Sequence, residues 1–286
     1  MLSYSQAILL GLLQGFSELF PISSLGHSVI LPHLLGWNIK QNDPFFLTFL
    51  VATHFATAIV LVGFYWNDWK KIVSGMGRSL KDRVIDPTNT YGKIGWLLVV
   101  GTIPVGILAL LLEDQLRQVF ASAKSAAFFL IVNGLLLYAA ERLRQRNLSK
   151  KRDPNSDAVI AKLTWKNALS VGGAQAIALI PGLSRSGASM GGGLLIGLNN
   201  EEAARFGFLL ATPVIGAAAL VKLGEFFNPA NHWLIGPAFA GALCSGITAF
   251  FALKYLVKYF ETNRLTPFAL YCVLAGTFYL IVVSIR

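Results

Sequence analysis

The feature that most constrains this chain is a series of long apolar stretches without a single charged side chain. A stretch of about 18 or more apolar residues is long enough to cross the hydrocarbon core of a bilayer as a helix. Two shorter runs can also span if flanking residues reach the interface or the bilayer thins. The runs are continuous rather than alternating, which excludes a transmembrane β-barrel. The sequence therefore predicts an all-α polytopic membrane protein with six transmembrane helices, within Phe45–Trp66, Ile94–Leu112, Ser125–Ala140, Phe206–Val221, Trp233–Leu253 and Leu265–Ile285.

The overall composition agrees with this class of protein. Charged residues make up only 13% of the 286 residues, and 55% are hydrophobic, whereas charged residues account for about 25% of a soluble globular domain. A net charge of +10 could indicate a nucleic-acid partner. The basic residues gather in loops beside the apolar runs, however, where anionic lipid headgroups are sufficient to explain them. We therefore expect membrane lipids as partners and no nucleic acid.

Two further apolar stretches, at residues 1–39 and 167–200, are interrupted near their middles by Pro, Gly and Ser. The interruptions are Pro21–His27 and Pro181–Gly187. Proline breaks a helix, and clusters of glycine and serine form loops. Irregular backbone at membrane depth is tolerated only where it is buried in protein or lines a wet cavity. We therefore predict two re-entrant helical hairpins whose loops meet inside the protein.

The predicted order is one hairpin and three spans, followed by a second hairpin and three spans. An odd number of spans per unit turns the second unit upside down, which is the plan of inverted-topology repeats with a site near the midplane. The repeats would cover about 1–145 and 160–286 of a single membrane domain. Weak similarity supports them, because Ser24 and Ser184 each follow a proline by three positions.

The distribution of basic residues predicts the orientation. Segments 67–93, 141–166 and 254–265 together carry 17 Lys and Arg residues, whereas the opposite side carries five. Basic loops stay in the cytoplasm. Both termini are therefore expected outside, with the first hairpin opening to the outer face.

Polar residues of the first hairpin form the first group of site candidates. An ionisable side chain inside an apolar stretch is costly and is a functional candidate by default. Glu18 is such a residue, and Gln14 lies one helical turn before it on the same face. Ser23 and Ser24 follow the proline and can cap the next half-helix, and His27 lies in its first turn.

The second hairpin contributes a basic residue and hydroxyls. Arg185 is the only charged residue within 167–200, and its planar fork matches phosphate oxygens. Glycines allow close backbone approach, and the N-terminus of a half-helix is an anion site. Two half-helix N-termini that face each other suit the two phosphate groups of a diphosphate. The candidates around Arg185 are Gly182, Ser184, Ser186, Gly187 and Ser189.

Each candidate also has a structural interpretation. Glu18 and Arg185 could form a buried ion pair that only stabilises the broken helices, and the serines could be helix caps. His54, in the middle of a predicted span, could line the site, but we expect a core histidine. The combination of an acid, hydroxyls and histidine in one loop with arginine and hydroxyls in the other favours chemistry over these interpretations.

The two motifs resemble those of the undecaprenyl-diphosphate phosphatase family, also called the bacitracin-resistance protein family. Its first motif is Glu or Gln, three residues and Glu, then Pro-x-Ser-Ser-x-Gly-His, matched by Gln14 to Glu18 and Pro21 to His27. Its second, Pro-Gly-x-Ser-Arg-Ser-Gly-x-Thr/Ser, is matched by Pro181 to Ser189. Many members have Glu at the position of Gln14 and Thr at that of Ser189. The first difference removes a possible metal-binding carboxylate.

The resemblance implies hydrolysis of undecaprenyl diphosphate to undecaprenyl phosphate and inorganic phosphate. This reaction recycles the lipid carrier of cell-wall synthesis on the outer face of the bacterial plasma membrane. It also implies a divalent cation, Mg²⁺ or Ca²⁺, which Glu18 and Gln14 would hold. Arg185 would clamp the diphosphate. The attacking group is either Ser24, with His27 as base, or a water activated by His27 or Glu18.

Two other classes of function compete with the phosphatase. A transporter of a polyprenyl phosphate could use the same inverted repeats and the same arginine, and a structural scaffold would leave the buried charges unexplained. A homodimer is also conceivable, because small residues such as Gly236, Ala240 and Gly241 can bring helices close together. Packing within the chain is the commoner use of such residues.

Overall fold

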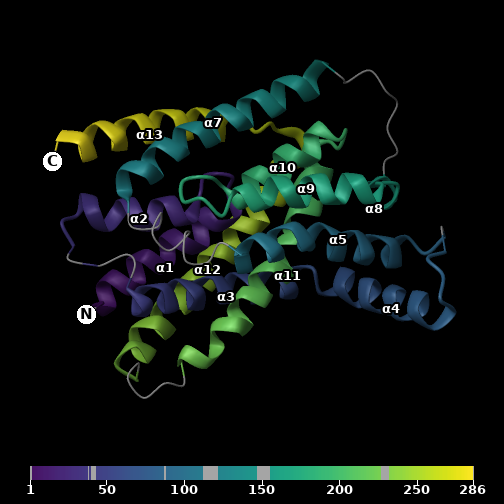
Figure 1. Ribbon diagram of the computed structural model, residues 1–286, viewed down its shortest axis with the longest axis horizontal. Coiled ribbons are helices and arrows are strands. Elements are labelled where there is room, and N and C mark those ends of the chain that lie inside the picture. The colour runs from purple at the N-terminus through teal and green to yellow at the C-terminus, as the bar shows by residue number, and fades with distance from the viewer. Residues whose placement is uncertain are drawn as a thin grey trace.

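The computed structural model describes residues 2–37, 39, 43–86, 88–111, 122–146, 155–226 and 232–285. Within these ranges the regular structure is entirely helical (Figure 1). The first half contains α1 (Tyr4–Leu19), α2 (Ser24–Leu34), α3 (Pro44–Phe64), α4 (Trp66–Asp82), α5 (Thr90–Leu111) and α7 (Ala123–Arg146). The second half contains α8 (Ser156–Ala161), α9 (Trp165–Ile177), α10 (Arg185–Leu195), α11 (Asn200–Phe226), α12 (His232–Thr262) and α13 (Thr266–Ile285).

Six of these helices, α3, α5, α7, α11, α12 and α13, are long and apolar enough to cross a membrane. The prediction of six spans is therefore confirmed by length and composition. The two shortest predicted runs, Ser125–Ala140 and Phe206–Val221, belong to longer helices. The spanning part of α7 is Ala123–Gln145 and that of α11 is Asn200–Val221, because both helices continue into polar residues. Neither span therefore needs a thinned bilayer.

Helix α4 is an element that the sequence reasoning treated only as part of a basic segment. It follows α3 directly, with Tyr65 between them. Its apolar face lies on α5, where Ile72 and Met76 contact the backbone around Gly95. The other face carries the basic residues. This amphipathic pattern places α4 beside the bundle rather than through it.

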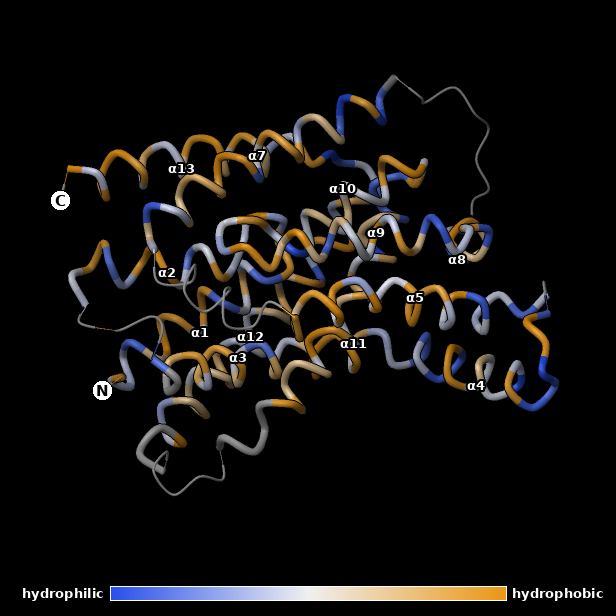
Figure 2. Tube along the Cα trace, in the orientation of Figure 1, coloured by the Kyte–Doolittle hydropathy of each residue, from blue (hydrophilic) through white to orange (hydrophobic). Residues whose placement is uncertain are grey.

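Both chain termini lie at one end of the molecule (Figure 1). The far end of α4, the short helix α8 and the last turns of α7 lie at the opposite end (Figure 1). Hydrophilic residues gather at that opposite end, whereas hydrophobic residues run along most of α5 and α13 (Figure 2). The basic segments around α4 and α8 are thus separated from the termini by the apolar bundle.

Two helix pairs, α1 with α2 and α9 with α10, are interrupted as the proline motifs predict. None of the four helices is among those long and apolar enough to span. The first connection, residues 20–23, joins α1 to α2, and the second, residues 178–184, joins α9 to α10. Both lie inside the protein, since Phe20, Ser23 and Leu183 are all buried. Close contact also joins the two connections, because a Cβ on Gly26 would lie 3.0 Å from Cα of Gly182.

The first helix of each pair packs in the same way on a helix from the other half of the chain. Helix α1 packs on α12, and α9 packs on α5. At the first crossing, a Cβ on Gly11 would collide with the backbone of Gly241; at the second, a Cβ on Gly172 would collide with the backbone of Gly101. Only glycine allows this approach. The two crossings are therefore built alike.

Two of the small residues of α12 that could serve a dimer, Gly236 and Gly241, are used within the chain. Gly241 packs against α1 and the ring of Phe49, and Gly236 lies beside the hydroxyl of Tyr4. Their small size is explained by this internal packing.

Candidate active site

The first connection ends in a strained residue that starts α2. Ser23 has φ of 69° and ψ of 94°, a conformation that a residue with a side chain rarely adopts and that tends to occur at functional sites. Its Oγ accepts a hydrogen bond of 3.1 Å from the backbone N–H of Gly26. Ser23 is therefore the helix cap that the sequence predicts. This geometry turns the next residue, Ser24, back toward α1.

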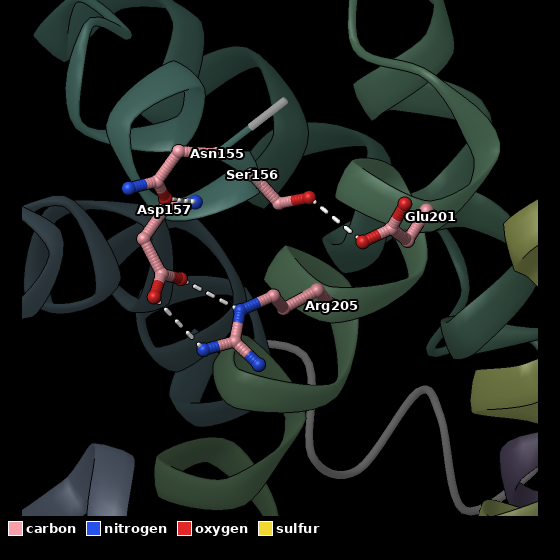
Figure 3. A pocket seen from close by; sticks show the side chains of 5 residues that line it. All are labelled: Asn155, Ser156, Asp157, Glu201 and Arg205. Carbon is pink, nitrogen blue, oxygen red and sulfur yellow. Dashed lines mark hydrogen bonds and ion pairs between the residues drawn. The ribbon is translucent and has the colours of Figure 1, made fainter. Parts of the chain in front are cut away.

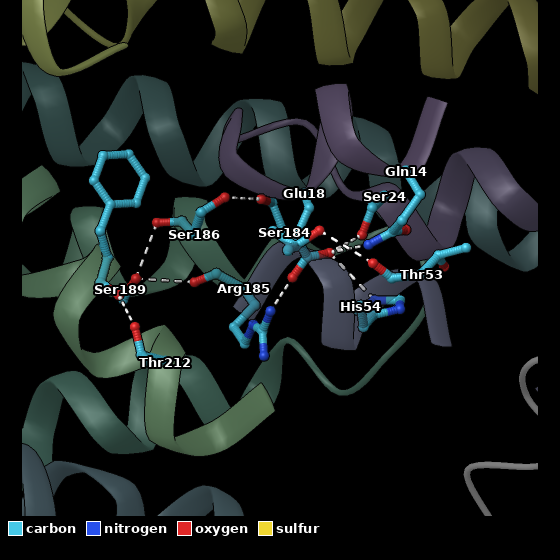
Figure 4. Close-up of polar contacts among 12 residues, drawn as sticks. Gln14, Glu18, Ser24, Thr53, His54, Ser184, Arg185, Ser186, Ser189 and Thr212 are labelled. Atoms are coloured by element: carbon cyan, nitrogen blue, oxygen red, sulfur yellow. Dashed lines mark hydrogen bonds and ion pairs between the residues drawn. The ribbon is translucent and has the colours of Figure 1, made fainter. Parts of the chain in front are cut away.

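The carboxylate of Glu18 is the centre of the site (Figure 4). Its Oε1 pairs with Nη2 of Arg185, the first residue of α10, which lies 167 positions away in the sequence. Its Oε2 accepts a hydrogen bond of 2.9 Å from Nε2 of Gln14 and another from Oγ of Ser24. Only 4% of the Glu18 side chain is exposed, so these partners replace water around a buried charge.

His54 also contacts Glu18 and therefore lines the candidate site, which is the alternative that the sequence did not favour. Its Nε2 lies 3.2 Å from Glu18 Oε2, and its Nδ1 lies 2.7 Å from the carbonyl of Leu50. Because a carbonyl only accepts, Nδ1 carries a proton. Nε2 therefore faces the buried carboxylate of Glu18 at the centre of the site. The available signal was a polar side chain within an uncharged span.

His27 is held in place by two partners, neither of which is Ser24. Its Nδ1 donates to the carbonyl of Ser23 at 2.7 Å. In the neutral ring Nε2 then accepts from the hydroxyl of Tyr271 at 2.8 Å. Tyr271 belongs to α13, and the sequence reasoning did not find it. The hydroxyl of Ser24 therefore faces Glu18 rather than the predicted base.

The hydroxyls at the start of α10 are bonded within the protein. Ser184 caps α10 by accepting from the N–H of Gly187 at 3.1 Å. Ser186 donates to the carbonyl of Phe20 at 3.0 Å, and Ser189 donates to the carbonyl of Arg185 at 3.1 Å. These bonds position Arg185. They also mean that the hydroxyls expected to bind substrate oxygens already have hydrogen-bond partners within the protein.

Gly182 has a packing role that its sequence position did not indicate. Its φ is 101°, which favours glycine. A Cβ at this position would lie 2.7 Å from Cβ of Phe129 on α7. The second connection thus rests directly on α7.

The donors around Glu18 suit a hard divalent cation. Oε1 of Gln14 is buried and has no hydrogen-bond partner, although a buried carbonyl oxygen almost always has one. Together with Glu18 and the hydroxyl of Ser24 it offers oxygen ligands, which Mg²⁺ and Ca²⁺ prefer. Within the described ranges no group of three or more His, Cys, Asp or Glu residues is placed to hold a metal. A cation at this position would therefore depend on amide and hydroxyl oxygens.

A separate open pocket lies where α8 meets α11 (Figure 3). Arg205 is already paired there with Asp157 at 2.7 Å and with Asp68 at 3.0 Å, and Ser156 donates to Glu201 at 2.8 Å. The pocket contains none of the predicted site residues. Its polar groups connect α4, α8 and α11, which is a structural role.

The fold and this site define a polytopic helical membrane protein in which two broken helix pairs bring an acid, an arginine and hydroxyls together with His54 of α3 in one buried centre. Residues 7–278 match the family described as "Bacitracin resistance protein BacA". The chain belongs to this family.

Named relatives extend over the full length of the chain. A protein of Mycolicibacterium paratuberculosis named undecaprenyl-diphosphatase is 42% identical over 100% of this chain and 99% of its own length. One of Gluconobacter oxydans with the same name is 42% identical over 96% of both chains. Undecaprenyl-diphosphatase 1 of Burkholderia pseudomallei is 40% identical over 95% of this chain and 94% of its own.

Proposed function

We propose that this chain hydrolyses undecaprenyl diphosphate to undecaprenyl phosphate and inorganic phosphate in the bacterial plasma membrane, recycling the lipid carrier of cell-wall synthesis. The relatives carry the name of this activity over their full lengths. The observation that carries the proposal for this chain is the position of Glu18. It pairs with Arg185 while it accepts a hydrogen bond from the hydroxyl of Ser24.

Arg185 is the residue that would clamp the diphosphate. A guanidinium has five N–H donors in a planar fork, and only Nη2 is engaged by Glu18. The remaining donors can bind phosphoryl oxygens without breaking the ion pair. Positive charge at this position stabilises the negative charge that develops during phosphoryl transfer.

Ser24 is the favoured attacking group. Its O–H already points at Glu18, so the carboxylate can accept the proton while Oγ attacks the terminal phosphorus and undecaprenyl phosphate leaves. Water would then release phosphate from the serine. In the alternative, Glu18 or His27 activates a water that attacks directly. Because His27 is bonded to Ser23 and Tyr271, we favour Glu18 over His27 as the base for Ser24.

A divalent cation fits beside these groups. Glu18, the unpartnered Oε1 of Gln14 and the hydroxyl of Ser24 would hold it. When bound, it would polarise the phosphoryl group and neutralise its charge.

The finer topology belongs to the same proposal. The short broken pairs α1 with α2 and α9 with α10 would be re-entrant hairpins in inverted repeats at about 1–145 and 160–286. The similar close crossings of α1 with α12, at Gly11 and Gly241, and of α9 with α5, at Gly172 and Gly101, support this plan. In addition, Gln14 follows Gly11 by three positions, as Gln175 follows Gly172.

The orientation follows from the charge distribution. The basic end around α4 and α8 would lie in the cytoplasm, and both termini, which share the opposite end (Figure 1), would lie outside. The site would then open to the outer face, where the tail of the substrate stays in lipid and its head group enters the protein.

The test is phosphate release from undecaprenyl diphosphate by purified protein in detergent, with and without EDTA. We expect cation-dependent release that both Glu18→Ala and Arg185→Ala lose. A folded wild-type protein that releases no phosphate with Mg²⁺ or Ca²⁺ would overturn the proposal. Measurement of lipid-phosphate flipping in liposomes would then test the carrier, which needs Arg185 but not the hydrogen bond from Ser24 to Glu18.

A further inference from the structure

Asn133, in the middle of α7, contacts both connections of the site. Its Nδ2 donates to the carbonyl of Pro21 at 3.0 Å, and its Oδ1 accepts from the N–H of Ser184 at 3.0 Å. The residue is 3% exposed. Pro21 lies between Glu18 and Ser24, and Ser184 directly precedes Arg185. One side chain thus joins the backbone segments that carry the acid, the hydroxyl and the arginine.

The chemistry of the two partners requires an amide at this position. A carbonyl can only accept and a backbone N–H can only donate, so the side chain must donate on one side and accept on the other. This requirement also fixes which atom of the amide faces which connection. The second hydrogen of Nδ2 points to Sγ of Cys272 at 3.3 Å. All the hydrogen-bonding groups of Asn133 are therefore employed at the site.

We propose that Asn133 is a positioning residue that sets the separation between the two connections. The first is flanked by Glu18 and Ser24, and the second is followed by Arg185. The inference rests on the proposed phosphatase activity. It goes beyond it, because Asn133 lies outside both sequence motifs and contacts neither Glu18 nor Arg185 through its side chain.

The surroundings support this role. Gly182 packs on the same helix, against Phe129 one turn earlier, so α7 is the surface on which the second connection rests. The direct contact of Gly26 with Gly182 and the hydrogen bond from Ser186 to Phe20 hold the connections together but leave sliding along α7 possible. Asn133 links both connections to that helix.

The experiment compares Asn133→Leu with Asn200→Leu. Asn200 is a matched control because it is also buried and also bridges segments, donating to Glu141 at 3.0 Å and to the carbonyl of Asn263 at 2.9 Å, away from the site. Both variants should lower the unfolding temperature. A shift of about 1 Å in reacting groups can reduce turnover about 100-fold, so we expect Asn133→Leu to lose kcat on that scale with KM nearly unchanged, and Asn200→Leu to keep kcat.

A second variant, Asn133→Asp, keeps the proposal testable if the leucine variant does not fold. A neutral carboxylic acid can donate to Pro21 and accept from Ser184, whereas a carboxylate can only accept. The ratio of its kcat to that of the wild type should therefore recover as the pH is lowered. A ratio that stays low at every pH, or an Asn133→Leu variant with wild-type kcat, would overturn the inference. Wild-type protein without phosphatase activity in the same assay would instead overturn the proposed function.

Discussion

Nε2 of His54 lies 3.2 Å from Oε2 of Glu18, so a transmembrane helix outside both sequence motifs contributes a side chain to the centre of the site. The same ring is tied to its own helix through Nδ1 and the carbonyl of Leu50. His54 thus lies where its ring can hold the carboxylate of Glu18 in position.

Replacement of His54 tests this relationship. His54→Phe keeps an aromatic ring but removes the nitrogen that faces Glu18, and we expect kcat to fall about 10- to 100-fold, as for the loss of a residue that orients a catalytic ligand. His54→Gln can still donate through its amide and should retain most of the activity. Steady-state phosphate release measures both. Equal losses in the two variants would show that the shape of the histidine ring matters rather than the polar contact with Glu18.

Arg185 should be required for turnover and not replaceable by lysine. Arg185→Ala should reduce kcat about 1,000-fold or more, the range for an arginine that stabilises phosphoryl transfer. Arg185→Lys cannot pair with Glu18 and hold two phosphate oxygens in one plane, so it should recover little. Full activity of Arg185→Lys would contradict the clamp.

Arg205 provides the matched control for that experiment. It lies on α11, a helix long enough to span, and is paired with Asp157 and Asp68 outside the site. Arg205→Ala leaves those carboxylates without a partner and should lower the free energy of unfolding by about 1–3 kcal/mol, with kcat of the folded fraction unchanged. Thermal unfolding and phosphate release, measured together, separate the two arginines.

Ser24 and Ser28 lie one turn apart on α2 and should respond differently to substitution by alanine. Ser24→Ala should lose about 1,000-fold or more in kcat, as nucleophile variants do, and acid quenching should trap phosphate on wild-type protein only. Oγ of Ser28 is buried without a partner, so Ser28→Ala should keep full activity. If no adduct forms and Ser24→Ala still turns over slowly, the nucleophile is water.

A change at Gln14 tests the proposed cation. Gln14→Glu places a second carboxylate one turn from Glu18, which repels in the absence of metal and binds a cation more tightly in its presence. We expect a lower unfolding temperature than wild type in EDTA and a larger rise on addition of Mg²⁺ or Ca²⁺, because binding to the native state stabilises it. An unfolding temperature of Gln14→Glu that is insensitive to both cations would argue against a metal at this position.

The sequence by itself determined the membrane class, the six spans and the two proline-broken segments. These features depend on local composition. The length of an uncharged apolar stretch decides whether a helix can span a membrane, and proline within a helix interrupts it. The cap formed by Ser23 was predictable for the same reason, since it depends on neighbours within one turn. The two motifs also contain Glu18, Ser24 and Arg185, which the fold brings together.

Only the tertiary structure decided which partner each of these residues has. His54 and Tyr271 come from spans whose composition resembles that of any lipid-facing helix, and Asn133 is a single amide in an apolar run. The ion pair of Glu18 with Arg185 joins residues 167 positions apart, and His27 bonds to Tyr271 rather than to Ser24. Such contacts depend on how helices cross, and the crossings are set by close glycine packing between segments far apart in the chain, which no local pattern encodes.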